Sequence, residues 1–193
     1  MHREPRIFQN KEQAREAFVK DVHRHQEYIR KAFDKYGNVF CKLANANYDA
    51  VEARIMSHDS SKIDDPVEAT GFIAWLYRYE QPDLPINSPR RKYLYQKALL
   101  NHFHTNSNHS EHWMEFKNFK TGYSPVEMDP ESVVEMVLDW IALGYETDYD
   151  PADLYWASHK EKKVIHEKTK KLVDDLIDFY YKSKDTSSSP KER

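Results

Sequence analysis

The chain has 193 residues, of which 39% are hydrophobic and 32% charged, and its formal net charge is −3. This size fits one domain that buries a core without disulfides, and the single cysteine, Cys41, allows no internal disulfide. No apolar run reaches the length of a membrane span, and the first residues lack a signal-peptide core. We therefore expect a cytoplasmic protein, in the host cytoplasm if the gene is viral, without membrane partners or a strong sign of nucleic-acid binding.

The chain has only four glycines, and its apolar residues recur at steps of three and four, which predicts an all-α fold. We expect a single helical domain over residues 11–182. It would follow an N-terminal extension at residues 1–10 and precede a disordered tail at residues 183–193, whose serines and charges do not support a core.

The first predicted helix covers residues 11–36 and would end before Gly37-Asn38, a pair typical of helix C-caps. Steps of three and four place one histidine on its apolar face, among Phe18, Val22, Ile29, Phe33 and Tyr36. This histidine is His25, whereas His23 points well away. His25 is therefore the candidate ligand of this helix.

A second predicted helix runs from about Tyr48 to the adjacent pair His58-Asp59. Val51 and Ile55 mark its apolar face, and the pair comes at the next inward turn. A neutral imidazole beside a carboxylate is a ready metal-binding unit. Because such a dipeptide is common by chance, its meaning depends on ligands supplied by other elements.

A loop follows, and Pro66 suits the first turn of a third helix, which we expect to continue to Tyr79. Residues 81–89 are too rich in proline to be regular. A fourth helix then begins near Arg90 and runs toward His102. Arg90 and its neighbour Arg91 could meet phosphate, or they could simply form the solvated start of this helix.

Four of the ten histidines lie between residues 101 and 113: His102, His104, His109 and His112. Asn and Ser between them interrupt helices by bonding their own backbone, which predicts a helix end followed by a tight connection. Such a bend can aim imidazoles at one point. The alternative is a polar loop in which histidines merely cluster.

Asp139 lies in a helix that begins at Asp129-Pro130-Glu131 and has apolar residues on both of its sides. A buried carboxylate without a partner would cost several kcal/mol or become protonated. Its partner is either a metal ion or a buried Arg, Lys or capping hydrogen bond. A last helix is predicted over residues 151–181.

The order of His25, the His58-Asp59 pair, the later histidines and Asp139 resembles the HD-domain superfamily of metal-dependent phosphohydrolases, which implies an HD-like helical bundle. Over about residues 20–145, the chain is also similar to an uncharacterised bacterial and phage family, domain of unknown function 5662. Three phrases carry this resemblance: His58-Asp59-Ser60-Ser61-Lys62, His102 to Asn106 to His109-Ser110-Glu111-His112-Trp113, and Glu135-Met136-Val137-Leu138-Asp139-Trp140. Where that family usually has two adjacent histidines before a Pro-Glu-His phrase, this chain has Asn108-His109 and Ser110. A second metal site would therefore lack the first of these histidines.

The resemblance implies one or two divalent ions. The primary ligands would be His25, His58, Asp59 and Asp139. His102 and His109 would complete a second metal site or contact substrate, and His104 and His112 are further candidates for these roles. Mixed nitrogen and oxygen ligands suit Mn, Fe, Co, Ni or Zn better than calcium, and Mg stays open.

The resemblance also implies roles for individual residues. Asp59 would touch both ions or orient the attacking water, and the catalytic set would comprise Asp59, Lys62 and His109. The substrate would be bound by Lys62, Arg90, Arg91 and His112, with the cationic side chains pairing with phosphate oxygens.

The expected function is therefore that of a divalent-metal-dependent phosphohydrolase, which uses a metal-activated water on a nucleotide or another small phosphoester. Three alternatives stay open. The first is an HD-type diiron oxygenase, the second a non-catalytic metal- or nucleotide-binding module, and the third a purely structural helical protein. The sequence leaves a homo-oligomer open.

Overall fold

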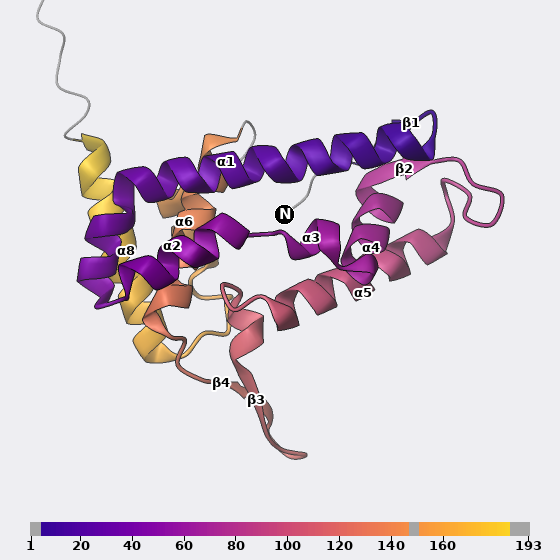
Figure 1. Cartoon of the computed structure of the whole chain (residues 1–193). Helices are drawn as coiled ribbons and strands as arrows, with labels where there is room; N and C mark the ends of the chain where they lie inside the picture. The colour runs from indigo at the N-terminus through magenta and orange to yellow at the C-terminus, as the bar shows by residue number, and fades with distance from the viewer. Residues whose placement is uncertain (1–4, 147–150, 186–193) are drawn as a thin grey trace, which may run out of the picture. The chain divides into compact units, whose positions relative to one another are not determined.

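The computed structural model describes residues 5–146 and 151–185, and helices dominate them (Figure 1). This confirms the all-α prediction, to which the structure adds only short strands. The described residues fall into two parts. The first part comprises residues 5–26 and 57–106, and the second comprises residues 27–56, 107–146 and 151–185.

The longest helix, α1, spans Lys11–Ala44, so the predicted end at residue 36 is wrong. Gly37 does not cap the helix but makes room for a ring within it. A Cβ atom on Gly37 would lie 2.5 Å from Cδ2 of Phe33, one turn earlier, which is too close for any real side chain. The glycine therefore reflects packing, and the C-cap interpretation missed this alternative.

Asn45 ends α1 instead, with a φ of 54° in the left-handed region. The N–H of Ala46 donates to the carbonyl of Cys41 at 2.8 Å, and the N–H of Asn45 donates to the carbonyl of Lys42 at 3.3 Å. These two bonds form a Schellman motif, in which asparagine is the usual substitute for glycine.

In the first part, α4 (Pro66–Leu76) and α5 (Pro89–Thr105) lie side by side (Figure 1). Their contact is close at Gly71, where a Cβ would lie 2.4 Å from both Cβ of Ala98 and the carbonyl oxygen of Leu94. The apolar core of this part is formed by Ala14, Phe18, Val22, Phe72, Tyr77 and Ala98. The beginning of α1 thus packs with the α4–α5 pair.

Two features of the first part differ from the sequence prediction. The residues after α4 form strand β2 (Tyr77–Tyr79), which pairs in parallel with β1 (Arg6–Phe8), so the predicted continuation of the helix to Tyr79 is wrong. The segment before α4 contains a short helix, α3 (Ser61–Asp64), where a loop was expected. Pro66 does begin α4, and the Asp65 carboxylate caps it by accepting two backbone N–H bonds.

Arg91 is fully buried in the first part, with 0% exposure. Its guanidinium donates to four backbone carbonyls, those of Ala74, Tyr79, Leu84 and Pro85. The side chain thus ties the irregular segment before α5 to the end of α4. This placement corrects the assignment of Arg91 to phosphate binding, because its donors already face the protein backbone.

The second part contains most of α2 (Tyr48–Ser57), the 3-10 helix η1 (Ser110–Trp113) and the hairpin of β3 (Met114–Asn118) and β4 (Gly122–Pro125). It also contains α6 (Pro130–Tyr145), α7 (Ala152–His159) and α8 (Glu167–Asp185). Buried residues from α6, α7 and α8 join the later half of α1 and α2 in one apolar core. Almost every α6 side chain between its first and last turns is buried.

The single helix predicted over residues 151–181 is wrong, because α7 ends at His159 and α8 begins at Glu167. Of the predicted tail, residues 183–185 belong to α8, while residues 186–193 lie outside the described residues. Residues 1–4 of the predicted extension also lie outside them, and its later residues include β1. Among the described residues, we find no helix with the length and apolar character needed to cross a membrane.

Replacing Arg91 with methionine would remove its hydrogen bonds to four backbone carbonyls, two of which are buried. We expect Arg91→Met to lower the free energy of unfolding by about 3 kcal/mol or more. Arg90→Met is the matched control, because Arg90 is exposed, and it should change stability by less than about 0.5 kcal/mol. Chemical denaturation of both variants measures the difference, and equal stabilities would refute the structural role of Arg91.

Candidate metal centre

The His58-Asp59 pair lies in the turn between α2 and α3. Asp59 has a φ of 60°, a left-handed conformation that Asp and Asn tolerate better than most residues. The buried amide of Gln26 on α1 donates to the carbonyl of His58 at 2.7 Å. The turn is therefore held to α1 one residue after His25, and this keeps the pair close to that histidine.

Three imidazoles of the first part surround the Asp59 carboxylate, and all four side chains are buried. On one side, Nε2 of His102 lies 3.4 Å from Oδ1. On the other side, Nε2 of His25 and Nε2 of His58 lie 3.9 Å and 3.8 Å from Oδ2. Each Asp59 oxygen thus has its own imidazole neighbours.

These separations are too long for good hydrogen bonds but close to those between ligands of a common ion. Two ligand atoms bound about 2.1 Å from one ion lie roughly 3.0–3.4 Å apart at octahedral or tetrahedral angles. Small side-chain movements would bring the nitrogens and the carboxylate to that spacing. The residues present therefore fit a divalent ion.

Lys62 contributes a positive charge to the cluster from one turn beyond Asp59. Its Nζ donates to Oδ2 of Asp59 at 2.5 Å and lies 5.7 Å from the centre of the Phe72 ring. The side chain is 18% exposed, in contrast to the buried carboxylate. Lys62 therefore connects the cluster to solvent.

Burial alone would raise the pKa of Asp59, because it penalises the charged carboxylate. The nearby Lys62 ammonium opposes this effect most strongly, and the imidazoles of His58, His102 and His25 add to it. The net result holds the pKa of Asp59 well below its ordinary range. Asp59 is thus an ionised carboxylate at neutral pH, the form that binds metals.

Sequence reasoning missed Glu68, which lies on α4 and is fully buried. Its Oε2 lies 2.9 Å from Nδ1 of His102, on the side of the ring opposite Asp59. One signal could have revealed it. Glu68 precedes Phe72 by four residues, and this spacing places it on the apolar face of α4, where a carboxylate needs partners.

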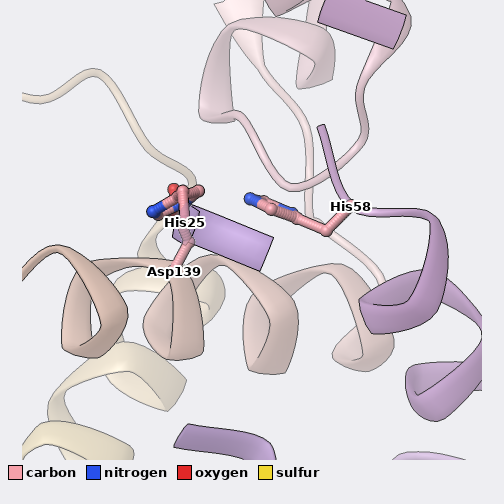
Figure 2. A group of neighbouring side chains, drawn as sticks. All are labelled: His25, His58 and Asp139. Carbon is pink, nitrogen blue, oxygen red and sulfur yellow. The ribbon is translucent and has the colours of Figure 1, made fainter. Parts of the chain in front are cut away.

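Asp139 is buried on α6, as its apolar neighbours in the sequence predicted. Figure 2 labels Asp139, which belongs to the second part, and His25 and His58, which belong to the first part. They are three of the four residues predicted as primary ligands.

The four histidines of the segment between residues 101 and 113 differ in burial. His102 belongs to the last turns of α5 and joins the Asp59 cluster, whereas His104, two residues later, is exposed. His109 is half-buried just before η1, and the exposed His112 packs its ring against Trp113 at 5.4 Å. The roles assigned to His109, His112 and the exposed Arg90 stay predictions.

The fold and this cluster define an all-α protein with a buried histidine and aspartate centre. The chain belongs to a family of unknown function, DUF5662, whose model matches residues 14–179. This confirms the family to which the three sequence phrases pointed. No curated protein and no solved structure matches the chain.

The lowered pKa of Asp59 has a consequence for stability against pH. Because the pKa in the folded state lies below the unfolded value of about 3.9, ionised Asp59 stabilises the fold above that value. This contribution falls as the pH drops from about 5 toward the lowered pKa. Asp59→Asn keeps the shape and tolerates the left-handed backbone but cannot ionise.

We expect the difference in unfolding free energy between wild type and Asp59→Asn, measured without metal, to grow from about pH 3 to pH 5 and then level off. Urea titrations at half-unit pH intervals measure it. A difference that stays constant over this range would contradict the lowered pKa.

Proposed function

We propose that this protein is a divalent-metal-dependent phosphohydrolase of the HD type, acting on a nucleotide or another small phosphoester. The observation that carries the proposal is the Asp59 carboxylate, which has imidazole nitrogens on two sides and is ionised at neutral pH. We further propose that it works in the cytoplasm, or in the host cytoplasm if the gene is viral.

The donor set supports a transition metal. Neutral imidazoles with carboxylates suit Mn, Fe, Co, Ni or Zn, whereas Mg prefers oxygen ligands and water. His25, His58, Asp59 and Asp139 would hold the primary ion. If a second ion binds, His102 would be its ligand on the Oδ1 side of Asp59, and His109 is the further candidate.

A bound ion would supply an activated water as the nucleophile and polarise the phosphoryl oxygens. The chain itself would provide position and charge. Asp59 orients the water through whichever oxygen is not engaged, and Lys62 pairs with the phosphate oxygens, over which charge spreads in the transition state. The exposed Arg90 is a further candidate for binding phosphate, whereas the buried Arg91 no longer is.

Metal content tests the site without assuming a substrate. Wild-type protein should retain at least one equivalent of Mn, Fe, Co, Ni or Zn, while His25→Ala, His58→Ala and Asp139→Asn should each lose most of it. His23→Ala is the matched control, because His23 is exposed on the same helix, and it should keep its metal. Elemental analysis of folded, dialysed protein measures the content, and equal content in all five proteins would refute the metal centre.

Turnover tests the reaction class. With Mn or Co, we expect wild-type protein to release phosphate from at least one member of a panel of deoxynucleotides, cyclic nucleotides and small phosphomonoesters. Lys62→Met should lower kcat/KM by roughly 10²- to 10³-fold, since it removes a charge that stabilises the transition state. Lys92→Met, at an exposed lysine, should leave kcat/KM unchanged.

Metal content and turnover, together with oxygen uptake and nucleotide binding, separate the alternatives. Iron that changes oxidation state and oxygen uptake without phosphate release would indicate a diiron oxygenase. Nucleotide binding without turnover would indicate a binding module, and protein that takes up no metal would indicate a purely structural role. Each of these results would overturn the hydrolase proposal.

A further inference from the structure

We infer that Glu68 is a positioning residue that fixes which ring nitrogen of His102 carries the proton. The inference deepens the proposed function, because its consequence for metal binding rests on His102 being a ligand. The proton position itself is a property of the metal-free protein. It can therefore be tested whether or not the hydrolase proposal holds.

The geometry begins with two facing groups on neighbouring helices. Glu68 on α4 has 0% exposure, and its Oε2 lies 2.9 Å from Nδ1 of His102 on α5. The other ring nitrogen, Nε2, faces Oδ1 of Asp59 at 3.4 Å. The imidazole of His102 thus lies between two buried carboxylates.

Glu68 receives two further donors besides the imidazole. The hydroxyl of Ser61 donates to Oε2 at 2.9 Å. The amide of Asn101 donates to Oε1 at 3.1 Å, whereas the Thr105 hydroxyl, 3.4 Å from the same oxygen, donates to the carbonyl of Asn101 at 2.9 Å. Because a carboxylate can only accept hydrogen bonds, the hydrogen in the 2.9 Å contact between Oε2 of Glu68 and Nδ1 of His102 belongs to Nδ1.

Two other donors lie near Nδ1 of His102. Oγ of Ser61 lies 3.5 Å away, but its one hydrogen goes to Oε2 of Glu68, at 2.9 Å. Nδ2 of Asn106 lies 3.0 Å from Nδ1. The same Nδ2 also lies 2.8 Å from the carbonyl oxygen of His102 and 3.2 Å from Oγ of Ser61. Two acceptors can thus take both hydrogens of the amide, so the hydrogen on Nδ1 can be donated to Glu68.

The proton on Nδ1 determines what Nε2 can do. In a neutral ring, Nε2 then carries a lone pair, and this lone pair faces the oxygen of Asp59. Two electron-rich atoms at 3.4 Å repel each other unless they share a cation. With the opposite tautomer, Nε2–H would donate to Asp59, and the repulsion between these two atoms would disappear. By holding the proton on Nδ1, Glu68 thus leaves two electron-rich atoms, Nε2 of His102 and Oδ1 of Asp59, that can bind a cation together.

The test is nitrogen NMR of the histidine rings in metal-free protein at pH 8, where His102→Gln assigns the His102 signals. In wild type, Nδ1 should be protonated and Nε2 unprotonated. In Glu68→Gln, the amide can donate to Nδ1, and we expect the Nε2–H tautomer to appear. Glu80→Gln, at an exposed glutamate, should show the wild-type spectrum.

Two results would overturn the inference. One is an Nε2–H tautomer in wild-type protein, which can be observed even if no variant folds. The other is an unchanged His102 spectrum in folded Glu68→Gln. A role of Glu68 confined to packing would alter stability without altering the tautomer.

Calorimetric titration with Mn and Zn measures the consequence. Glu68→Gln should weaken binding by 10- to 100-fold, the range for loss of a partner that orients a metal-bound histidine. Wild-type protein that binds neither ion would refute the proposed function and leave the NMR result standing. Tight binding by wild type and Glu68→Gln alike would refute the consequence drawn for Glu68.

Discussion

The carboxylate of Asp59 is buried, and its negative charge has to be balanced by groups that fold around it. Lys62 supplies a positive charge, and the imidazoles of His25, His58 and His102, which come from two further helices and the same turn of the first part, lower the pKa of Asp59 further. The left-handed backbone of Asp59 is tolerated because these contacts hold the turn in place. Burial and electrostatics therefore act together here, since the neighbours that keep Asp59 ionised also surround it with imidazole nitrogens, which are of the type that can bind a metal.

The buried charge of Arg91 has a structural role, because its hydrogen-bond partners are backbone carbonyls. The Arg91 guanidinium directs its hydrogen bonds to fixed backbone carbonyls, so it stabilises one arrangement of the chain and has little left for a ligand. Lys62 instead has one carboxylate partner and partial access to solvent. Under the proposed function, Lys62 rather than Arg91 would therefore meet the phosphate.

Helical periodicity predicted the all-α class and selected His25 over His23, because burial on one face of a helix is a local property of sequence. It also predicted the burial of Asp139. Periodicity did not predict that α1 continues through Gly37, since only the Phe33 ring in three dimensions explains that glycine. The pairing of β1 with β2 was missed because it joins Arg6–Phe8 to Tyr77–Tyr79, which lie far apart in the sequence. The break between α7 and α8 was missed as well.

Glu68 is the residue of the site that the sequence did not predict. Metal ligands were sought among histidines and aspartates, but the atom that orients His102 belongs to a glutamate on a different helix. The two oxygens of Asp59 face different imidazoles, and on the His102 side Glu68 adds a buried carboxylate behind the ring. Under the proposed function, a histidine held by a buried carboxylate would be preorganised as a metal ligand on the Oδ1 side of Asp59.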